Sequence, residues 1–234
     1  MRLFCLLGAA VLPVLPAISS AAADEGPGDC LGVDFAIAQP IAVARALPGQ
    51  PRIYFIKSTM DDARCPADTE ACREKAYLIP GDVALVGKAY GSYTCVAYES
   101  AASRKVQWTN GWLPSASLAT VTPAASPKRA DWTGQWVHAG GHIDITPGDK
   151  GSLAIHGEGF YAAAQNVHTG VLDAAAKPTG KVLEFADDGG VAFDDPKAEC
   201  RVRMQRIAAL LVVEDNNACG GVMVTFTGFY RRKN

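Results

Sequence analysis

The chain has 234 residues, of which 49% are hydrophobic and 20% charged, and its formal net charge is −2 at pH 7. This hydrophobic content is sufficient for a packed core and excludes an intrinsically disordered chain. The charge balance argues against nucleic acid as a partner, because nucleic-acid-binding proteins present a basic surface. The length fits one large domain or two small ones.

Residues 1–23 are typical of a secretory signal peptide. Arg2 gives a positive start, an apolar run covers residues 3–18, and small residues up to Ala23 offer a cleavage site. Two prolines interrupt the apolar run, which is too short to span a membrane. The sequence has no other long apolar run. We therefore predict cleavage after Ala23 and an exported protein without a transmembrane segment, in the periplasm or outside the cell.

Six cysteines follow the predicted cleavage site, and an even number in an exported chain is typical of disulfides. Four lie within residues 24–121 and two within residues 131–234, and we expect each half of the chain to pair its own cysteines. The predicted disulfides are Cys65–Cys72, Cys30–Cys95 and Cys200–Cys219. The cysteine spacing is not that of a zinc site, and we predict no cofactor.

Residues 24–121 are predicted to form one small β-barrel or sandwich. Short β-type runs alternate with turn residues, at Ile41–Arg45, Arg52–Ile56, Ala76–Ile79, Val83–Val86 and Tyr93–Tyr98. Pro80-Gly81-Asp82 supplies a tight turn, because proline presets φ and glycine accepts a positive φ. Only residues 69–75 carry a weak helical pattern.

Gly111-Trp112-Leu113-Pro114, followed by a short turn into a last strand, resembles the closing motif of bacterial Src-homology-3-like domains. Leu78–Val83 and Tyr93–Tyr98 are similar to the start of an early strand and to the central strand of that family. The resemblance covers about residues 53–118. It implies a small barrel that binds a partner or supports structure and has no catalytic centre.

In the eukaryotic branch of this family, an aromatic groove binds proline-rich segments. Trp112 and Pro114 match that groove by position, whereas Ser117 replaces an expected tyrosine and Tyr93-Thr94 replaces paired tryptophans. Both departures argue against a proline-rich ligand. The candidate ligand-binding residues are Tyr93, Tyr98, Trp108, Trp112 and Pro114. The alternative is that Trp112 belongs to the core.

Residues 122–130 are rich in proline, alanine and other small residues and predict a linker. Residues 131–234 then carry strand-like runs separated by turn signals, which predicts an antiparallel up-and-down β-barrel or a strongly curled sheet. The predicted strands are His142–Thr146, Ser152–His156, Val182–Phe185, Cys200–Met204, Leu210–Glu214 and Val222–Tyr230.

Gly134-Gln135-Trp136 resembles the Gly-x-Trp motif that opens the barrels of the lipocalin and avidin, or calycin, superfamily. The resemblance implies that a terminal arginine, Arg231 or Arg232, covers Trp136. It also implies an interior that either holds a small ligand or is filled by side chains, and the many alanines and glycines favour a filled barrel. The two-part layout as a whole resembles that of other exported bacterial proteins.

All four histidines lie in residues 131–234 and are candidate metal ligands: His138, His142, His156 and His168. The four-residue spacing of the first two suits a helix, but two glycines between them argue against one. We interpret the histidines as separate surface residues. The Asp-rich segment 187–195 lacks the pattern of a calcium loop and is interpreted as a solvated turn. We predict no metal site.

Asp215–Gly221 is the most distinctive segment of the second half. Its glycines allow a tight backbone, and its candidate binding residues are Asp215, Asn216 and Asn217. A protruding loop of this kind inserts into a partner's cleft in exported enzyme inhibitors. The alternative is a turn held by a disulfide, with no function of its own.

Enzyme signatures are scarce in this sequence. No histidine follows Cys200 or Cys219, and there is neither a Gly-x-Ser-x-Gly elbow nor a phosphate-binding glycine loop. We predict an exported, non-enzymatic binding protein of the bacterial envelope that engages a cell-wall component or another exported protein. The alternatives are an inhibitor of an exported hydrolase, a cell-envelope hydrolase that uses carboxylates, and a purely structural envelope protein.

Overall fold

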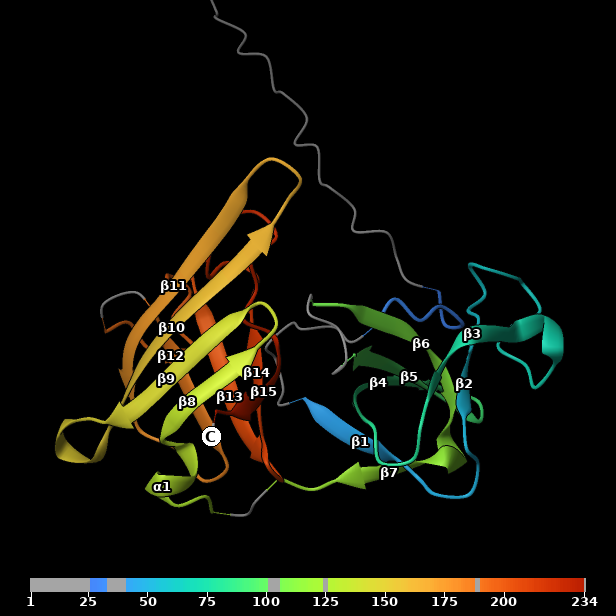
Figure 1. The fold of residues 1–234 in the computed structure, drawn as a ribbon, viewed down its shortest axis with the longest axis horizontal. Coiled ribbons are helices and arrows are strands. Elements are labelled where there is room, and N and C mark those ends of the chain that lie inside the picture. The colour runs from blue at the N-terminus through green and yellow to red at the C-terminus, as the bar shows by residue number, and fades with distance from the viewer. Residues whose placement is uncertain (1–25, 33–40, 101–105, 124–125, 188–189, 234) are drawn as a thin grey trace, which may run out of the picture.

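A computed structural model describes residues 26–32, 41–100, 106–123, 126–187 and 190–233. The predicted signal peptide lies outside these ranges. The described chain is all-β, and its strands form two antiparallel sheets that lie side by side (Figure 1). One of these sheets is a nearly closed barrel. The all-β fold class predicted from the sequence is therefore confirmed.

The first sheet has seven strands in the order β3-β2-β6-β5-β4-β1-β7. Their bounds are β1 (Ala42–Ala46), β2 (Ile53–Ile56), β3 (Arg73–Leu78), β4 (Val83–Tyr90), β5 (Tyr93–Glu99), β6 (Trp108–Pro114) and β7 (Leu118–Val121). A short 3-10 helix, η1 (Glu70–Cys72), precedes β3, and a second one, η2 (Ser115–Ser117), joins β6 to β7. The weak helical pattern of residues 69–75 thus corresponds to η1 and the first residues of β3.

Trp112 lies at the centre of a small core that contains two disulfides. The predicted Cys30–Cys95 and Cys65–Cys72 bonds are both formed, and their sulfurs pack with Trp112. The Trp112 side chain is fully buried, and its indole N–H donates to the Gly28 carbonyl at 3.0 Å. This hydrogen bond satisfies the one polar atom of the ring, as burial of tryptophan requires.

The second sheet has eight strands in the order β11-β10-β9-β8-β15-β14-β13-β12. A short helix, α1 (Arg129–Trp132), leads into it, and η3 (Asp149–Gly151) joins β9 to β10. The strands are β8 (Gly134–His138), β9 (Gly141–Pro147), β10 (Leu153–Ala162), β11 (Val167–Ala176), β12 (Val182–Ala186), β13 (Arg201–Ile207), β14 (Leu210–Asp215) and β15 (Gly228–Arg232). Because β15 returns to pair with β8, the strands form an up-and-down barrel whose open seam lies between β11 and β12.

Side chains from all eight strands fill the barrel interior as one buried cluster that includes Trp136, Leu172 and Tyr230. The guanidinium of Arg232 lies 4.9 Å from the Trp136 ring centre, as expected for a terminal arginine. Arg206, which sequence reasoning missed, lies over the same ring at 4.3 Å. Trp136 is therefore covered by two cations at the end of the barrel where α1 lies.

The prediction of one strand over Val222–Tyr230 is wrong, because only Gly228–Arg232 forms β15. The residues before β15 turn towards β10 instead. Phe226 packs so closely on Gly157 and Gly159 that an added Cβ atom at either glycine would lie 3.1–3.2 Å from its ring. Burial of the Phe226 ring in the barrel interior outweighs the β-propensity of residues 222–227.

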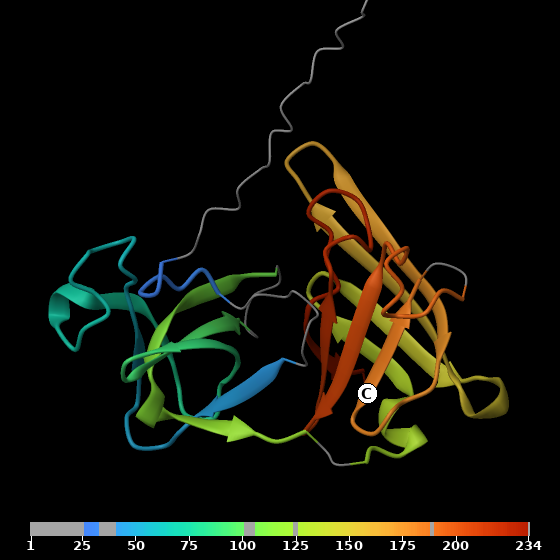
Figure 2. The same cartoon turned by 180° about the vertical axis from the view of Figure 1, so that it is seen from behind.

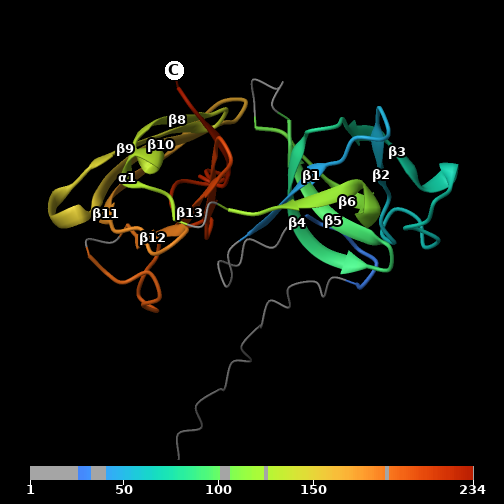
Figure 3. The ribbon, with the colours of Figure 1, turned by 90° about the horizontal axis from the view of Figure 1, so that it is seen from below.

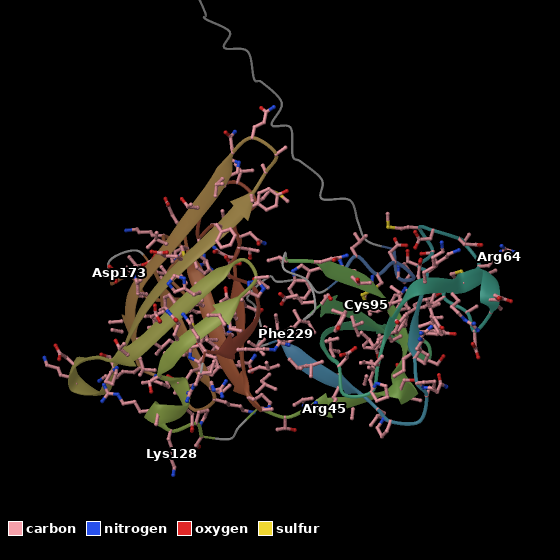
Figure 4. The ribbon with its side chains drawn as sticks, viewed as in Figure 1. Arg45, Arg64, Cys95, Lys128, Asp173 and Phe229 are labelled. Carbon is pink, nitrogen blue, oxygen red and sulfur yellow. A yellow bond between two sulfur atoms is a disulfide. The ribbon has the colours of Figure 1, made fainter. Side chains whose placement is uncertain are left out.

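The outer face of β13, β14 and β15 packs against the first sheet. Ile207, Val212 and Phe229 share one apolar cluster with residues of β1, β4 and β5. Beside this cluster, Glu99 accepts a hydrogen bond from the Phe229 N–H at 3.0 Å and lies 2.5 Å from His138 Nε2. Figure 2 shows the orange and red strands next to the first sheet, and Figure 4 labels Phe229 at the junction.

Candidate functional site

The five binding candidates in the first sheet do not form one exposed surface. Trp112 and Tyr93 belong to the disulfide core, while Tyr98 packs in a different cluster. Trp108 lies at the junction, with its ring centre 6.3 Å from that of Phe229. Pro114 is half-buried opposite Tyr93. Burial raises the pKa of both tyrosines, which agrees with a packing role for these rings.

Asp215, a predicted loop residue, is fully buried inside the second sheet. Its carboxylate accepts hydrogen bonds from Thr225 Oγ1 at 2.6 Å, Thr227 Oγ1 at 2.9 Å and the Phe226 N–H at 3.0 Å. These bonds fix the segment that returns to β15. Asp215 therefore positions the loop and does not face a ligand.

The rest of the loop is anchored by Asn216 and by the predicted Cys200–Cys219 disulfide, which is formed. The Asn216 side chain accepts a hydrogen bond from the Arg201 N–H at 3.0 Å. Asn217 is exposed and has a φ of 58°, a conformation that asparagine tolerates better than most residues. The loop is thus a rigid element whose most exposed apolar residues come later in the sequence.

Six large apolar side chains, each 40–70% exposed, gather at one end of the barrel. We call this surface the apolar tip, and its members are Phe160, Tyr161, Val167, Val171, Val222 and Met223. The first four come from the end of the β10–β11 hairpin, which extends beyond the other strands (Figure 1). Sequence reasoning missed all six, although the uncharged turn between β10 and β11 was a signal.

Backbone contacts hold the loop of the apolar tip against its hairpin. The Gly221 N–H donates to the Thr169 carbonyl of β11 at 3.0 Å. An added Cβ atom at Gly170 would lie 2.7 Å from the Cys219 carbonyl oxygen and 2.9 Å from Gly220 Cα. Only glycine at position 170 permits this close approach of two backbones. The loop therefore lies against the inward side of the hairpin, and Phe160, Val167 and Val171 lie on the outward side of the same projection.

Met223 occupies a strained corner of the loop. The Val224 N–H donates to the Gly221 carbonyl at 3.0 Å, which closes a turn with Val222 and Met223 at its two corners. The φ of Met223 is 66°, a value that glycine or asparagine normally supplies in such turns. A large exposed apolar side chain in this conformation has no packing role that would offset its strain. Strain of this kind clusters at functional sites.

The apolar tip is also free of strong charge. Residues 159–172 and 216–228 contain no lysine, arginine, aspartate or glutamate. The ring centre of His168 lies 6.4 Å from that of Tyr161, and Glu158 of β10 pairs with Val171 across the hairpin. A partner of this surface therefore meets mainly apolar side chains and backbone groups, with the Glu158 carboxylate at its edge beside Val171.

The four histidines lie apart from one another. His138 is buried at the junction beside Glu99, while His142 and His156 lie on the outer barrel face, near Asp144 and Glu158. Within the described ranges, no three His, Cys, Asp or Glu side chains are placed to hold a metal ion. Part of the Asp-rich segment 187–195 lies outside those ranges.

Glu214 is the carboxylate whose environment comes closest to that of a catalytic acid. Burial raises its pKa to about 7, against the opposing effect of a hydrogen bond from the Ile41 N–H and of Arg203. Its side chain is only 3% exposed and faces the junction. Asp215 lies on the opposite face of β14, so these two carboxylates do not form a pair.

Comparison of the chain with family models, curated proteins and solved structures gave no match. Over the described ranges, no helix has the length and apolar character needed to cross a membrane. The three disulfides are consistent with an oxidising, exported location. Function is therefore inferred from the geometry and chemistry of the site itself.

Proposed function

We propose that the protein is an exported, non-enzymatic binding protein that engages a folded protein partner through the apolar tip. The observation that carries this proposal is Met223, a strained and exposed apolar residue beside an exposed apolar hairpin end. Monomeric soluble proteins rarely expose contiguous apolar patches without an interaction to serve. The rigid support of the loop suits a pre-organised binding surface.

The chemistry of the apolar tip favours a protein over the other envelope components. A bilayer surface is anionic and recruits amphipathic elements that carry lysine or arginine, which the tip lacks. A cell-wall polymer offers hydroxyl and amide groups that require matching polar side chains. Aromatic and aliphatic anchors on a rigid scaffold are typical of protein interfaces.

The proposed fold assignments are a Src-homology-3-like domain followed by a barrel of the lipocalin and avidin type. The 3-10 helix η2 between β6 and β7 supports the Src-homology-3-like reading of residues 53–118. Arg232 over Trp136 supports the lipocalin and avidin reading of residues 131–234. Export is supported by the three disulfides together with the predicted signal peptide.

Inhibition of an exported hydrolase is a specific form of the same proposal. It is favoured by the shape of the β10–β11 hairpin, which extends beyond the barrel and carries Phe160 and Tyr161 near its end (Figure 1). Such a projection fits a substrate cleft. A hydrolase that binds the apolar tip would lose activity in proportion to occupancy, whereas a partner bound outside its cleft would not.

The test is site-specific photo-crosslinking in cells that export the protein. A photoreactive phenylalanine analogue replaces Val167 or Val222 of the apolar tip, which are 66% and 70% exposed, or Ile79 after β3, a 51% exposed control. We expect one protein adduct of defined mass from positions 167 and 222 and none from position 79. Adducts of equal yield from all three positions, or none at all, would reject the proposal.

A further inference from the structure

The outer face of β9, β10 and β11 continues directly from the apolar tip. Along β10, His156, Glu158 and Phe160 point outwards because alternate residues of a strand share a face. The strand register places Asp144 of β9 and Asp173 of β11 on either side of His156. This face points away from the first sheet, as Figure 3 shows for the strands and Figure 4 for Asp173.

Carboxylates are the only permanently charged groups on this face. All residues of β9, β10 and β11 are described, and their outward positions carry no lysine or arginine. These positions are His142, Asp144, Thr146, Ala154, His156, Glu158, Phe160, Ala162, Val167, Thr169, Val171, Asp173 and Ala175. We call Asp144, Glu158 and Asp173 the acidic face. The chain as a whole has 22 basic and 24 acidic residues, so this absence of cations is local.

The carboxylates are available to a partner. The Asp144 side chain is 36% exposed and the Glu158 side chain 62% exposed. Their nearest charged neighbours are His142, with Nε2 at 3.5 Å from Asp144, and His156, with Nε2 at 3.9 Å from Glu158. Neither distance is that of a hydrogen bond, and the side-chain donor to Asp144 among the described residues, Gln135 Nε2 at 3.4 Å, is uncharged, so both carboxylates are open to a cation from outside.

We propose that the partner of the apolar tip is a basic protein, whose apolar recess receives the tip and whose cationic rim meets the acidic face. This inference rests on the proposed function. Unbalanced charge next to an uncharged contact surface adds little to the final affinity but speeds encounter with an oppositely charged partner. The acidic face beside the apolar tip therefore favours basic partners, because these associate faster than neutral or acidic ones.

The test uses as its probe the purified protein that forms the adduct at position 167. Association and dissociation rates are measured for the wild type, for Asp144→Asn/Glu158→Gln/Asp173→Asn, and for a control variant of equal charge change. The control is Asp68→Asn/Glu70→Gln/Glu74→Gln, on and before β3 of the first sheet. We expect the first variant to associate about tenfold more slowly at low salt, with a dissociation rate changed less than about twofold.

The control variant is expected to associate at the wild-type rate, and added salt is expected to remove the difference between the variants. Near-ultraviolet circular dichroism confirms that each variant is folded. Equal association rates for wild type and acidic-face variant, or equal slowing by the control, overturn the inference. In either case the proposed function stands as long as tip substitutions abolish affinity. If no adduct forms at position 167, both fail.

Discussion

At the scale of single residues, we expect one substitution of Met223 to change stability and partner binding in opposite directions. Replacing it with glycine removes an unfavourable positive φ, so we expect Met223→Gly to raise the free energy of unfolding by about 1 kcal/mol. The same change deletes an exposed apolar side chain from the apolar tip and should weaken partner binding at least about tenfold. Urea denaturation and a binding titration measure the two effects.

A matched variant controls this experiment. Lys150 also has a positive φ, of 50°, but lies in η3 at the other end of the hairpin. Lys150→Gly should stabilise the fold to a similar extent and leave binding unchanged. If Met223→Gly bound the partner as well as the wild type, Met223 would have no part in the interface.

Glu214 makes the stability of the protein depend on pH. Its pKa is raised from 4.5 in the unfolded chain to about 7 by burial, so folding favours its protonated form. The resulting stabilisation is fully present below pH 4.5 and is lost as pH rises through 7, a change of about 3 kcal/mol. Glu214→Gln should therefore be more stable than the wild type at pH 8, and this advantage should shrink to less than about 1 kcal/mol at pH 5.

Urea denaturation between pH 5 and pH 8 measures this difference, with Glu74→Gln on the first sheet as the control. If the free energies of unfolding of the wild type and Glu214→Gln changed with pH in the same way, ionisation of Glu214 would not destabilise the folded protein. Burial at the junction would then not raise the pKa of Glu214.

Contacts between particular residues could be predicted from the sequence better than the solvent exposure of side chains. The pairing of all six cysteines followed from their locality, and Arg232 over Trp136 followed from the family resemblance. Asp215 was a reasonable candidate by residue type, but its three hydrogen-bond donors come from Thr225–Thr227, ten and more positions away in the chain. No local pattern reveals that such partners turn back towards it.

At the scale of elements, the Cys200–Cys219 disulfide fixes the loop half of the apolar tip. It closes a loop with a sequence separation of 19, for which the loss of loop-closure entropy corresponds to about 3 kcal/mol. We expect Cys200→Ala/Cys219→Ala to lower the free energy of unfolding by about this amount. Affinity for the partner should fall as well, because Val222 and Met223 are no longer held beside β11.

Removal of the Cys65–Cys72 disulfide provides the comparison, since it lies in the first sheet, away from the apolar tip. Cys65→Ala/Cys72→Ala should reduce stability without changing the affinity of the protein that remains folded. Unchanged affinity after loss of Cys200–Cys219 would show that the hairpin alone binds the partner.

The β10–β11 hairpin marks the limit of prediction at this scale. Strands with clear period-2 alternation, such as His142–Thr146, were predicted correctly, whereas β11 was not predicted at all. Polar and small residues interrupt its alternation, because its upper half extends beyond the barrel and has no core to cover. The extension beyond the barrel makes the β10–β11 hairpin a candidate binding site. The same extension removes the apolar–polar alternation by which strands are recognised in a sequence.

At the scale of the whole molecule, the two sheets are joined by an apolar cluster and a buried polar contact. His138 is buried, accepts a hydrogen bond from the Gly140 N–H at 3.1 Å, and faces Glu99 of the first sheet at 2.5 Å. We expect His138→Ala and Glu99→Ala each to destabilise the protein by about 3 kcal/mol, since each leaves a buried polar group unpaired. A double-mutant cycle should show a coupling of at least about 1 kcal/mol.

Denaturant unfolding of the two single variants and the double variant gives this coupling directly. Additive effects would show that Glu99 and His138 do not interact across the junction. The first sheet would then serve the barrel only through the apolar contacts of Ile207, Val212 and Phe229.

Binding at the apolar tip is tested by the affinity of the cross-linked partner for two variants, each of which replaces two exposed apolar residues with serine. Phe160→Ser/Val167→Ser alters the apolar tip, at side chains 49% and 66% exposed. Ile79→Ser/Met60→Ser alters the first sheet, at side chains 51% and 65% exposed. The tip variant should lose at least about a hundredfold in affinity, and the control should bind like the wild type. Equal affinity for the two variants would contradict the assignment of binding to the apolar tip.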